Sequence, residues 1–146
     1  MNRQRPLFLA CLLLAAAALM AQQGDVPAYH AGPPAKGTVL PPILSQERLW
    51  GADFQYPYQR HAYELAAKIP NVLYQQPCYC YCDRMGHRSL HSCFESSHAA
   101  ECGVCLKELY YTYQSTREGR TPRQIRAGII RGDWKQIDLE NAATIQ

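Results

Sequence analysis

A dense group of cysteines is the feature that most constrains this chain. Six of its seven cysteines and three of its five histidines lie between Gln75 and Glu108. Thiols at this density can be crosslinked to one another, bound to a metal ion, or used to transfer electrons. The spacing of these residues ranks the three uses.

The N-terminus has the layout of a secretory signal peptide. A short basic start with Arg3 and Arg5 precedes an apolar run from Pro6 to Ala21, and polar residues follow. The run is shorter than the about 20 residues that a membrane-spanning helix needs. We expect cleavage near Ala21, loss of Cys11 with the peptide, and export to the periplasm or the extracellular space. Membrane association is expected only if residues 1–21 are retained.

The charge balance gives no reason to expect a nucleic-acid partner. The whole chain carries a formal charge of +3, from 15 basic and 12 acidic residues. Loss of Arg3 and Arg5 leaves 13 basic against 12 acidic residues, or +1. Nucleic-acid binding normally needs a basic patch or stripe, which a nearly balanced chain does not supply.

The chain beyond residue 21 divides into a spacer and a domain. Residues 22–47 are rich in proline and glycine, a composition typical of a flexible linker. His30 lies in this linker and is expected to be solvated and without a role. Residues 48–146 form the cysteine-rich domain, which is small enough that a metal ion or disulfides would help to stabilise it.

Apolar residues in the domain recur with a helical period. The pattern predicts helices over Arg60–Ile69, over residues 99–119 after an N-cap at Ser97, and over residues 122–132. No stretch shows the alternation of a strand. The expected fold class is mainly α, a small helical domain of about three helices with a cysteine-rich loop. Trp134 and Ile137 are expected to close over its core.

One group of cysteine and histidine side chains lies at the start of the long predicted helix. Cys102 and Cys105 form a CxxC motif, and His98 precedes Cys102 by four residues. Positions i, i+4 and i+7 fall on one helical face, so these three side chains are predicted to point the same way. A helix N-terminus also favours negative charge and therefore thiolates.

The other group lies earlier in the chain and is a CxCxC motif made by Cys78, Cys80 and Cys82. In an extended segment these side chains would project to one side, and in a turn they could wrap around an ion. A loop containing Cys93 separates this motif from the CxxC motif. We expect the two groups to meet in the folded chain.

The string PCYCYC, then GHRSL, then SCFESSHAAECGVC, resembles the bacterial PCYCGC or CYCxC family of small exported proteins and lipoproteins, some of them described as selenoproteins. The resemblance covers residues 62–137. The glycine of PCYCGC is Tyr81 here, and no cysteine is placed for lipid attachment. The resemblance implies an exported, thiol-centred protein. The motif positions are Cys78, Cys80, Cys82, Cys93, His98, Cys102 and Cys105.

Metal binding accounts best for this crowding. Thiolates with an imidazole suit zinc or copper(I). His98, Cys102 and Cys105 with one CxCxC sulfur would make a four-coordinate site, and all six sulfurs could hold a small copper(I) cluster. His87 and His91 are spare donors, expected to be solvated or capping.

Two alternatives stay open. The protein could be a thiol–disulfide redox protein that uses Cys102 and Cys105 and acts on partner proteins, although the βαβ pattern of a thioredoxin-like fold is missing. It could also be a binding module held together by three disulfides, as is common in small exported domains. Cysteines two residues apart rarely bridge without strain, which argues against that arrangement. Nothing in the sequence indicates hydrolytic chemistry, and whether the protein is an enzyme is left open.

Overall fold

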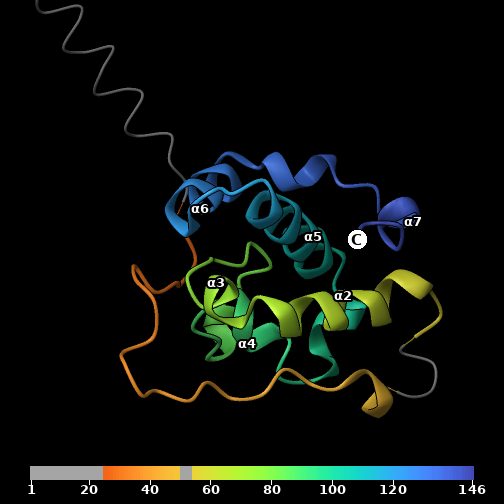
Figure 1. The fold of residues 1–146 in the computed structure, drawn as a ribbon, viewed down its shortest axis with the longest axis horizontal. Helices are drawn as coiled ribbons and strands as arrows, with labels where there is room; N and C mark the ends of the chain where they lie inside the picture. The colour runs from red at the N-terminus through yellow and green to blue at the C-terminus, as the bar shows by residue number, and fades with distance from the viewer. Residues whose placement is uncertain (1–24, 50–53) are drawn as a thin grey trace, which may run out of the picture.

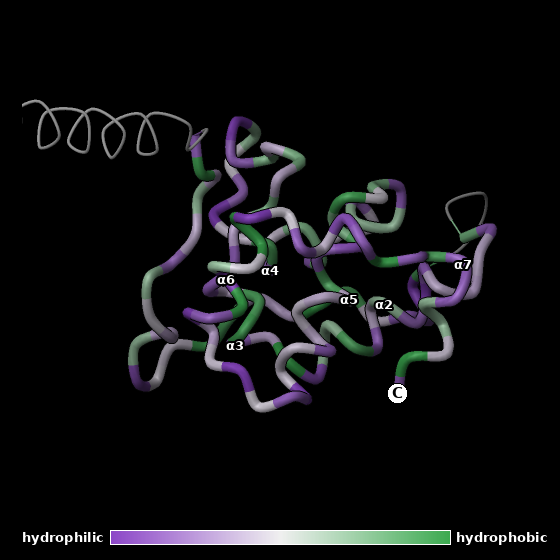
Figure 2. Tube along the Cα trace, turned by 90° about the horizontal axis from the view of Figure 1, so that it is seen from above, coloured by the Kyte–Doolittle hydropathy of each residue, from purple (hydrophilic) through white to green (hydrophobic). Residues whose placement is uncertain are grey.

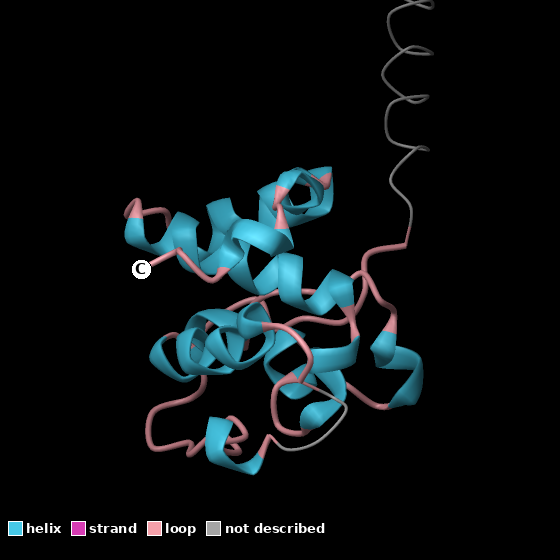
Figure 3. Cartoon of the chain, turned by 90° about the vertical axis from the view of Figure 1, so that its right-hand side faces the viewer, coloured by secondary structure: helices cyan, strands magenta, loops and turns pink. Residues whose placement is uncertain are grey.

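The fold is entirely helical over the residues that the structure describes. The structure is a computed structural model, and it describes residues 25–49 and 54–146. These residues form six α-helices and four short 3-10 helices, and no strand is found among them (Figure 3). The predicted mainly-α fold class is confirmed. The expected signal peptide, with Cys11, lies outside the described residues.

The three longest helices are those that the sequence predicts. They are α2 (Pro57–Lys68), α5 (Gly103–Arg117) and α6 (Pro122–Arg131). Helix α2 begins three residues before the predicted start. A proline at its first position needs no hydrogen-bond partner, and the Gln59 side chain accepts a hydrogen bond from the backbone N–H of Tyr56 at 2.9 Å.

Short helices lie before, between and after these three. Such pieces carry too few turns to leave a periodic signal of their own, so the sequence did not predict them as separate elements. They are η1 (Gln46–Arg48), α3 (Pro70–Leu73), η3 (Cys82–Met85), α4 (Leu90–Cys93), η4 (Ser97–Glu101), η5 (Asp133–Gln136) and α7 (Leu139–Ala142).

Helix α5 is the central element of the domain. It packs against α2, α3 and α4 on one side and against α6, η5 and α7 on the other (Figure 1). Apolar and polar residues alternate along the helices, as expected where each helix has one apolar face (Figure 2). Among the described helices, none is both long enough and apolar enough to cross a membrane.

The main core contains the cysteines as well as ordinary apolar side chains. Tyr63 of α2, Phe94, and Leu109 of α5 are among its largest fully buried side chains. Cys78, Cys82, Cys93 and Cys105 belong to the same core. The donor groups are therefore part of the packing that stabilises the domain.

A second, smaller core lies under α6. Ile125 and Ile129 of α6 pack there with Tyr111 and Trp134, and Ile137 contacts both cores. The expected closure of Trp134 and Ile137 over the core is confirmed.

The N-terminal segment contacts the domain at several points. Residues 25–47 run around its outside (Figure 1), and the backbone N–H of Leu44 donates to the carbonyl of Phe94 at 2.8 Å. The His30 ring stacks on Tyr74 with ring centroids 3.7 Å apart. The expectation of a solvated, idle His30 is therefore wrong, because an aromatic ring far along the sequence offers it a stacking surface.

Candidate metal centre

The long predicted helix is interrupted at Cys102. Residues Ser97–Glu101 form η4, and Cys102 is extended (φ −114°, ψ 103°) before α5 begins at Gly103. The 3-10 segment has three residues per turn, and the extended Cys102 changes the direction of the chain. The prediction that His98, Cys102 and Cys105 share one helical face is therefore wrong, and the turn between them brings His98 to the donors instead.

The CxCxC motif forms a turn. The backbone N–H of Tyr81 donates to the carbonyl of Cys78 at 3.1 Å, which closes the turn. Tyr81 has left-handed backbone angles (φ 57°, ψ 33°), and among the described residues it is the only non-glycine residue with a positive φ. Of the two conformations considered from the sequence, the turn that wraps its sulfurs around a centre is the one found.

Three hydrogen bonds hold this turn against the rest of the domain. The carbonyl of Gln76 accepts from the N–H of Leu90 at 2.8 Å, and the carbonyl of Cys82 accepts from the N–H of His87 at 3.2 Å. The Glu108 carboxyl accepts from the N–H of Tyr79 at 2.8 Å. The turn is thereby fixed to α4 and to α5, which carry other donors.

Five donor atoms meet at one point. Each lies within 4.8 Å of the others, and they are the sulfurs of Cys80, Cys82, Cys93 and Cys105 with one ring nitrogen of His98. The sulfurs of Cys80 and Cys105 are 3.5 Å apart, and His98 Nε2 lies 3.0 Å from Cys82 Sγ. Thiolates on a tetrahedral zinc ion are about 3.8 Å apart, as follows from a Zn–S bond of about 2.3 Å. The distances between these donor atoms are therefore close to those between the ligands of one metal ion, and this site could hold a metal ion.

The two remaining cysteines adjoin these five donors. Cys78 Sγ lies 3.1 Å from Cys80 Sγ and 3.4 Å from Cys105 Sγ. The thiol of Cys102 is close enough to affect the pKa values of Cys80 and Cys105. The expected meeting of the CxCxC and CxxC motifs is what the structure shows, although Cys78 and Cys102 lie outside the tightest group.

His87 contacts the cluster, which the sequence did not predict. Its Nδ1 lies 3.3 Å from Cys93 Sγ, and its ring meets that of His98 edge to face with centroids 5.1 Å apart. Gly86, with φ 96°, turns the chain so that His87 faces the cluster. In the sequence, a glycine and a histidine four and five residues after Cys82 were the signal that could have predicted this contact.

His91 is not a solvated spare donor either. It is buried in α4, and its Nδ1 lies 3.0 Å from the carboxylate of Glu95. The i, i+4 spacing on the α4 turn explains the pair, which engages His91 outside the donor group.

The thiols affect one another's protonation. Hydrogen bonds from Cys102, Cys105 and the other neighbouring thiols lower the pKa of Cys80. The pKa of Cys105 is raised by the thiols around it and by burial, and the pKa of Cys82 is raised mainly by burial. A cation placed among the thiols would displace their protons.

Glu108 is a buried carboxyl beside the cluster. It is fully buried one turn after Cys105, and its Oε2 has no hydrogen-bond partner. Burial raises its pKa to about 8. The sequence signal for this burial was an acidic residue on the apolar face of α5, beside Leu109.

The arrangement of the cysteines does not resemble a set of separate structural disulfides. All six cysteines between Cys78 and Cys105 are free thiols. Three disulfides that stabilise a small domain normally join different parts of it, whereas these thiols all lie in one place. The geometry therefore favours a shared centre over the disulfide-bonded module.

The chain belongs to a known family. Residues 45–138 match the family described as protein of unknown function with PCYCGC motif. This confirms the resemblance seen in the sequence, and it places Tyr81 where the motif has glycine. A search of curated proteins and a search of solved structures found no match.

Proposed function

We propose that this protein is an exported binder of a soft transition metal ion, copper(I) or zinc. The observation that carries the proposal is the convergence of four sulfurs and one imidazole nitrogen within 4.8 Å. Thiolate and imidazole are the ligands that these ions prefer, whereas magnesium and calcium prefer oxygen. Export is proposed from the signal-like residues 1–21.

The number of donors favours copper(I). Zinc in a structural site is satisfied by four ligands. Six sulfurs and the rings of His87 and His98 gather here, which exceeds that requirement. Shared thiolates let several copper(I) ions form a compact cluster, and soft thiolate ligands select copper(I).

The protein contributes geometry and exclusion of water. Cys78, Cys82, Cys93 and Cys105 are buried, while Cys80 and Cys102 are half-buried. Binding requires the thiols to lose their protons. The buried sulfurs would hold the ion in a space that water enters poorly.

The thiol–disulfide alternative rests on a different observation. Cys102 is half-buried at the N-cap of α5, with Cys105 one turn deeper, which is the layout of an attacking and a resolving thiol. Although Cys105 lowers it, the pKa of Cys102 is raised overall by the Cys80 thiol and by burial, which opposes this role because thiolate is the reactive form.

Metal content and free-thiol count distinguish the two functions. We expect protein purified from its own compartment to contain copper or zinc by mass spectrometry. A chelator that removes the metal should expose the six thiols and lower the melting temperature, because metal binding contributes to folding stability. Protein that carries no metal and melts at the same temperature with and without chelator would contradict the proposal. Fractionation of cells tests export separately.

A further inference from the structure

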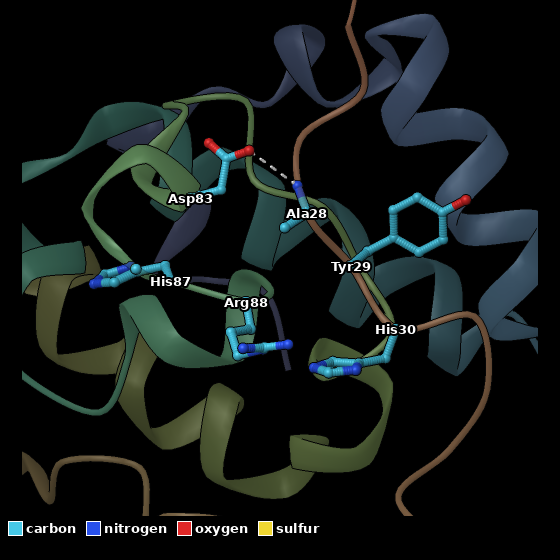
Figure 4. Close-up of a pocket in the computed structure, with 7 residues that line it drawn as sticks. Ala28, Tyr29, His30, Asp83, His87 and Arg88 are labelled. Atoms are coloured by element: carbon cyan, nitrogen blue, oxygen red, sulfur yellow. Dashed lines mark hydrogen bonds between the residues drawn. The ribbon is translucent and has the colours of Figure 1, made fainter.

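A polar hollow opens beside the cluster. It has a volume of about 400 Å³ and lies between the N-terminal segment at residues 28–30 and the turn at residues 83–88 (Figure 4). Pockets that hold small molecules have volumes of about 300–1,000 Å³, so this hollow has room for a ligand of amino-acid size. On its inner side, Pro27 and Ala28 lie over Cys78 and Cys82.

The charged side chains that line the hollow are one acidic, Asp83, and one basic, Arg88. The carboxylate of Asp83 is already engaged, because its Oδ2 accepts from the N–H of Ala28 at 3.2 Å and its Oδ1 from the N–H of Arg84 at 3.0 Å. Arg88 is exposed, and its guanidinium has no ion-pair or hydrogen-bond partner among residues 25–49 and 54–146. Its side chain extends toward His30 (Figure 4). A guanidinium without a partner in a polar hollow is suited to a carboxylate.

His87 connects the hollow to the donors. It lines the hollow, and its Nδ1 lies 3.3 Å from Cys93 Sγ inside the cluster. The same residue therefore meets both a solvent-filled space and a buried thiol. No other imidazole of the cluster lines this hollow, since His98 is absent from its walls.

We propose that this hollow receives the metal ion as a complex with a small carboxylate-bearing ligand, such as an amino acid, and that His87 is the first protein group to take the metal. Arg88 pairs with the carboxylate of the carrier. This inference rests on the proposed function, since it concerns how the same centre is loaded.

The transfer is an exchange of ligands without a change of oxidation state. The imidazole of His87 replaces one donor of the carrier on the metal. The thiol of Cys93 then loses its proton as its sulfur replaces the next carrier donor. That proton goes to the carrier donor that has been released. Arg88 keeps the carrier in place by its carboxylate while these bonds change.

Two carriers that differ in one group test this role of Arg88. Cysteine and cysteamine offer the same thiol and amine donors, but only cysteine has a carboxylate. Zinc or copper(I), whichever the protein binds at equilibrium, is mixed with each carrier, and the rate of transfer to the metal-free protein is measured by stopped flow. We expect Arg88→Gln to slow transfer from the cysteine complex about tenfold and to leave transfer from the cysteamine complex unchanged.

Arg84→Gln is the matched control. Arg84 is an exposed arginine of the same turn that does not line the hollow, so its variant should behave as the parent does. His87→Ala should slow transfer from both carriers. An Arg88→Gln variant that is slowed equally with both carriers, or with neither, would overturn the proposal. Failure of the proposed function is a separate result, seen as zero metal bound at equilibrium by the parent.

Discussion

Replacing Tyr81 tests the conformation of the CxCxC turn. Tyr81 occupies the position where the family motif has glycine, and it holds φ 57° and ψ 33°. A left-handed conformation costs a residue with a Cβ atom about 1–2 kcal/mol, a cost that glycine does not carry. Glycine instead loses about 0.5–1 kcal/mol more backbone entropy on folding than alanine. Tyr81→Gly should therefore be more stable than Tyr81→Ala by about 0.5–1 kcal/mol.

The tyrosine ring contributes separately from the backbone. It meets the ring of Tyr79 edge to face with centroids 6.0 Å apart, and the Arg84 guanidinium lies 5.2 Å from its centroid. Contacts of these two kinds are worth about 0.5–1.5 kcal/mol and about 0.5–1 kcal/mol respectively at exposed or half-buried sites. Both variants lose them equally, so the parent is expected to be the most stable of the three, and alanine the least.

Urea unfolding of the three proteins in the same metal state measures this order. A difference of about 1 kcal/mol corresponds to about 4–8 °C in melting temperature for a domain of this size, which differential scanning calorimetry resolves. The glycine variant should also keep the full metal stoichiometry, because its turn is unchanged. An alanine variant as stable as the glycine variant, or more so, would show that residue 81 is not left-handed in the folded protein.

Three further changes give expected outcomes. His98→Ala should weaken metal affinity at least tenfold in a competition titration, because it removes a donor; the control His61→Ala should not, because His61 bonds to Tyr110 and lies outside the donor group. Glu108 has an ordinary pKa of 4.5 and a folded pKa of about 8. The folded state therefore keeps a proton that the unfolded state releases, and metal-free stability should be lost as pH rises through this range. Relative to Glu108→Gln, the parent should lose about 1.4 kcal/mol per pH unit there in urea unfolding, and equal slopes would refute this assignment. Gly128→Ala should destabilise the domain by about 1–3 kcal/mol, because the new Cβ would overlap the Tyr111 hydroxyl and lie 2.7 Å from its ring carbon Cζ. Adding Tyr111→Phe should recover part of that loss in thermal melting, and no recovery would exclude the steric cause.

The long helices and the meeting of the two motifs could be predicted from the sequence. Helix α6 shows why: Thr121 caps it, Pro122 occupies its first position, and Gly132 with φ 85° ends it. Each of these residues acts through its own local backbone preference. Local signals of this kind do not depend on the rest of the fold, so the sequence contains them in full.

The details of the site depended on contacts between distant residues. The interruption at Cys102 leaves the helical period of the sequence almost unchanged, so the pattern predicted one continuous helix. The stacking of His30 on Tyr74 and the burial of Glu108 against the N–H of Tyr79 join residues far apart in the chain. Periodicity and spacing carry no information about such pairs.

Because the buried cysteines are both donors and core residues, the centre limits how this protein can diverge. Exchanging Cys82, Cys93 or Cys105 for histidine or aspartate would change the ligand chemistry, and it would also place a larger or charged group in a closely packed interior. Half-buried Cys80, Cys102, His87 and His98 can vary at a lower cost in stability. Differences in metal preference among relatives are therefore expected at these outer positions, while the inner sulfurs stay the same.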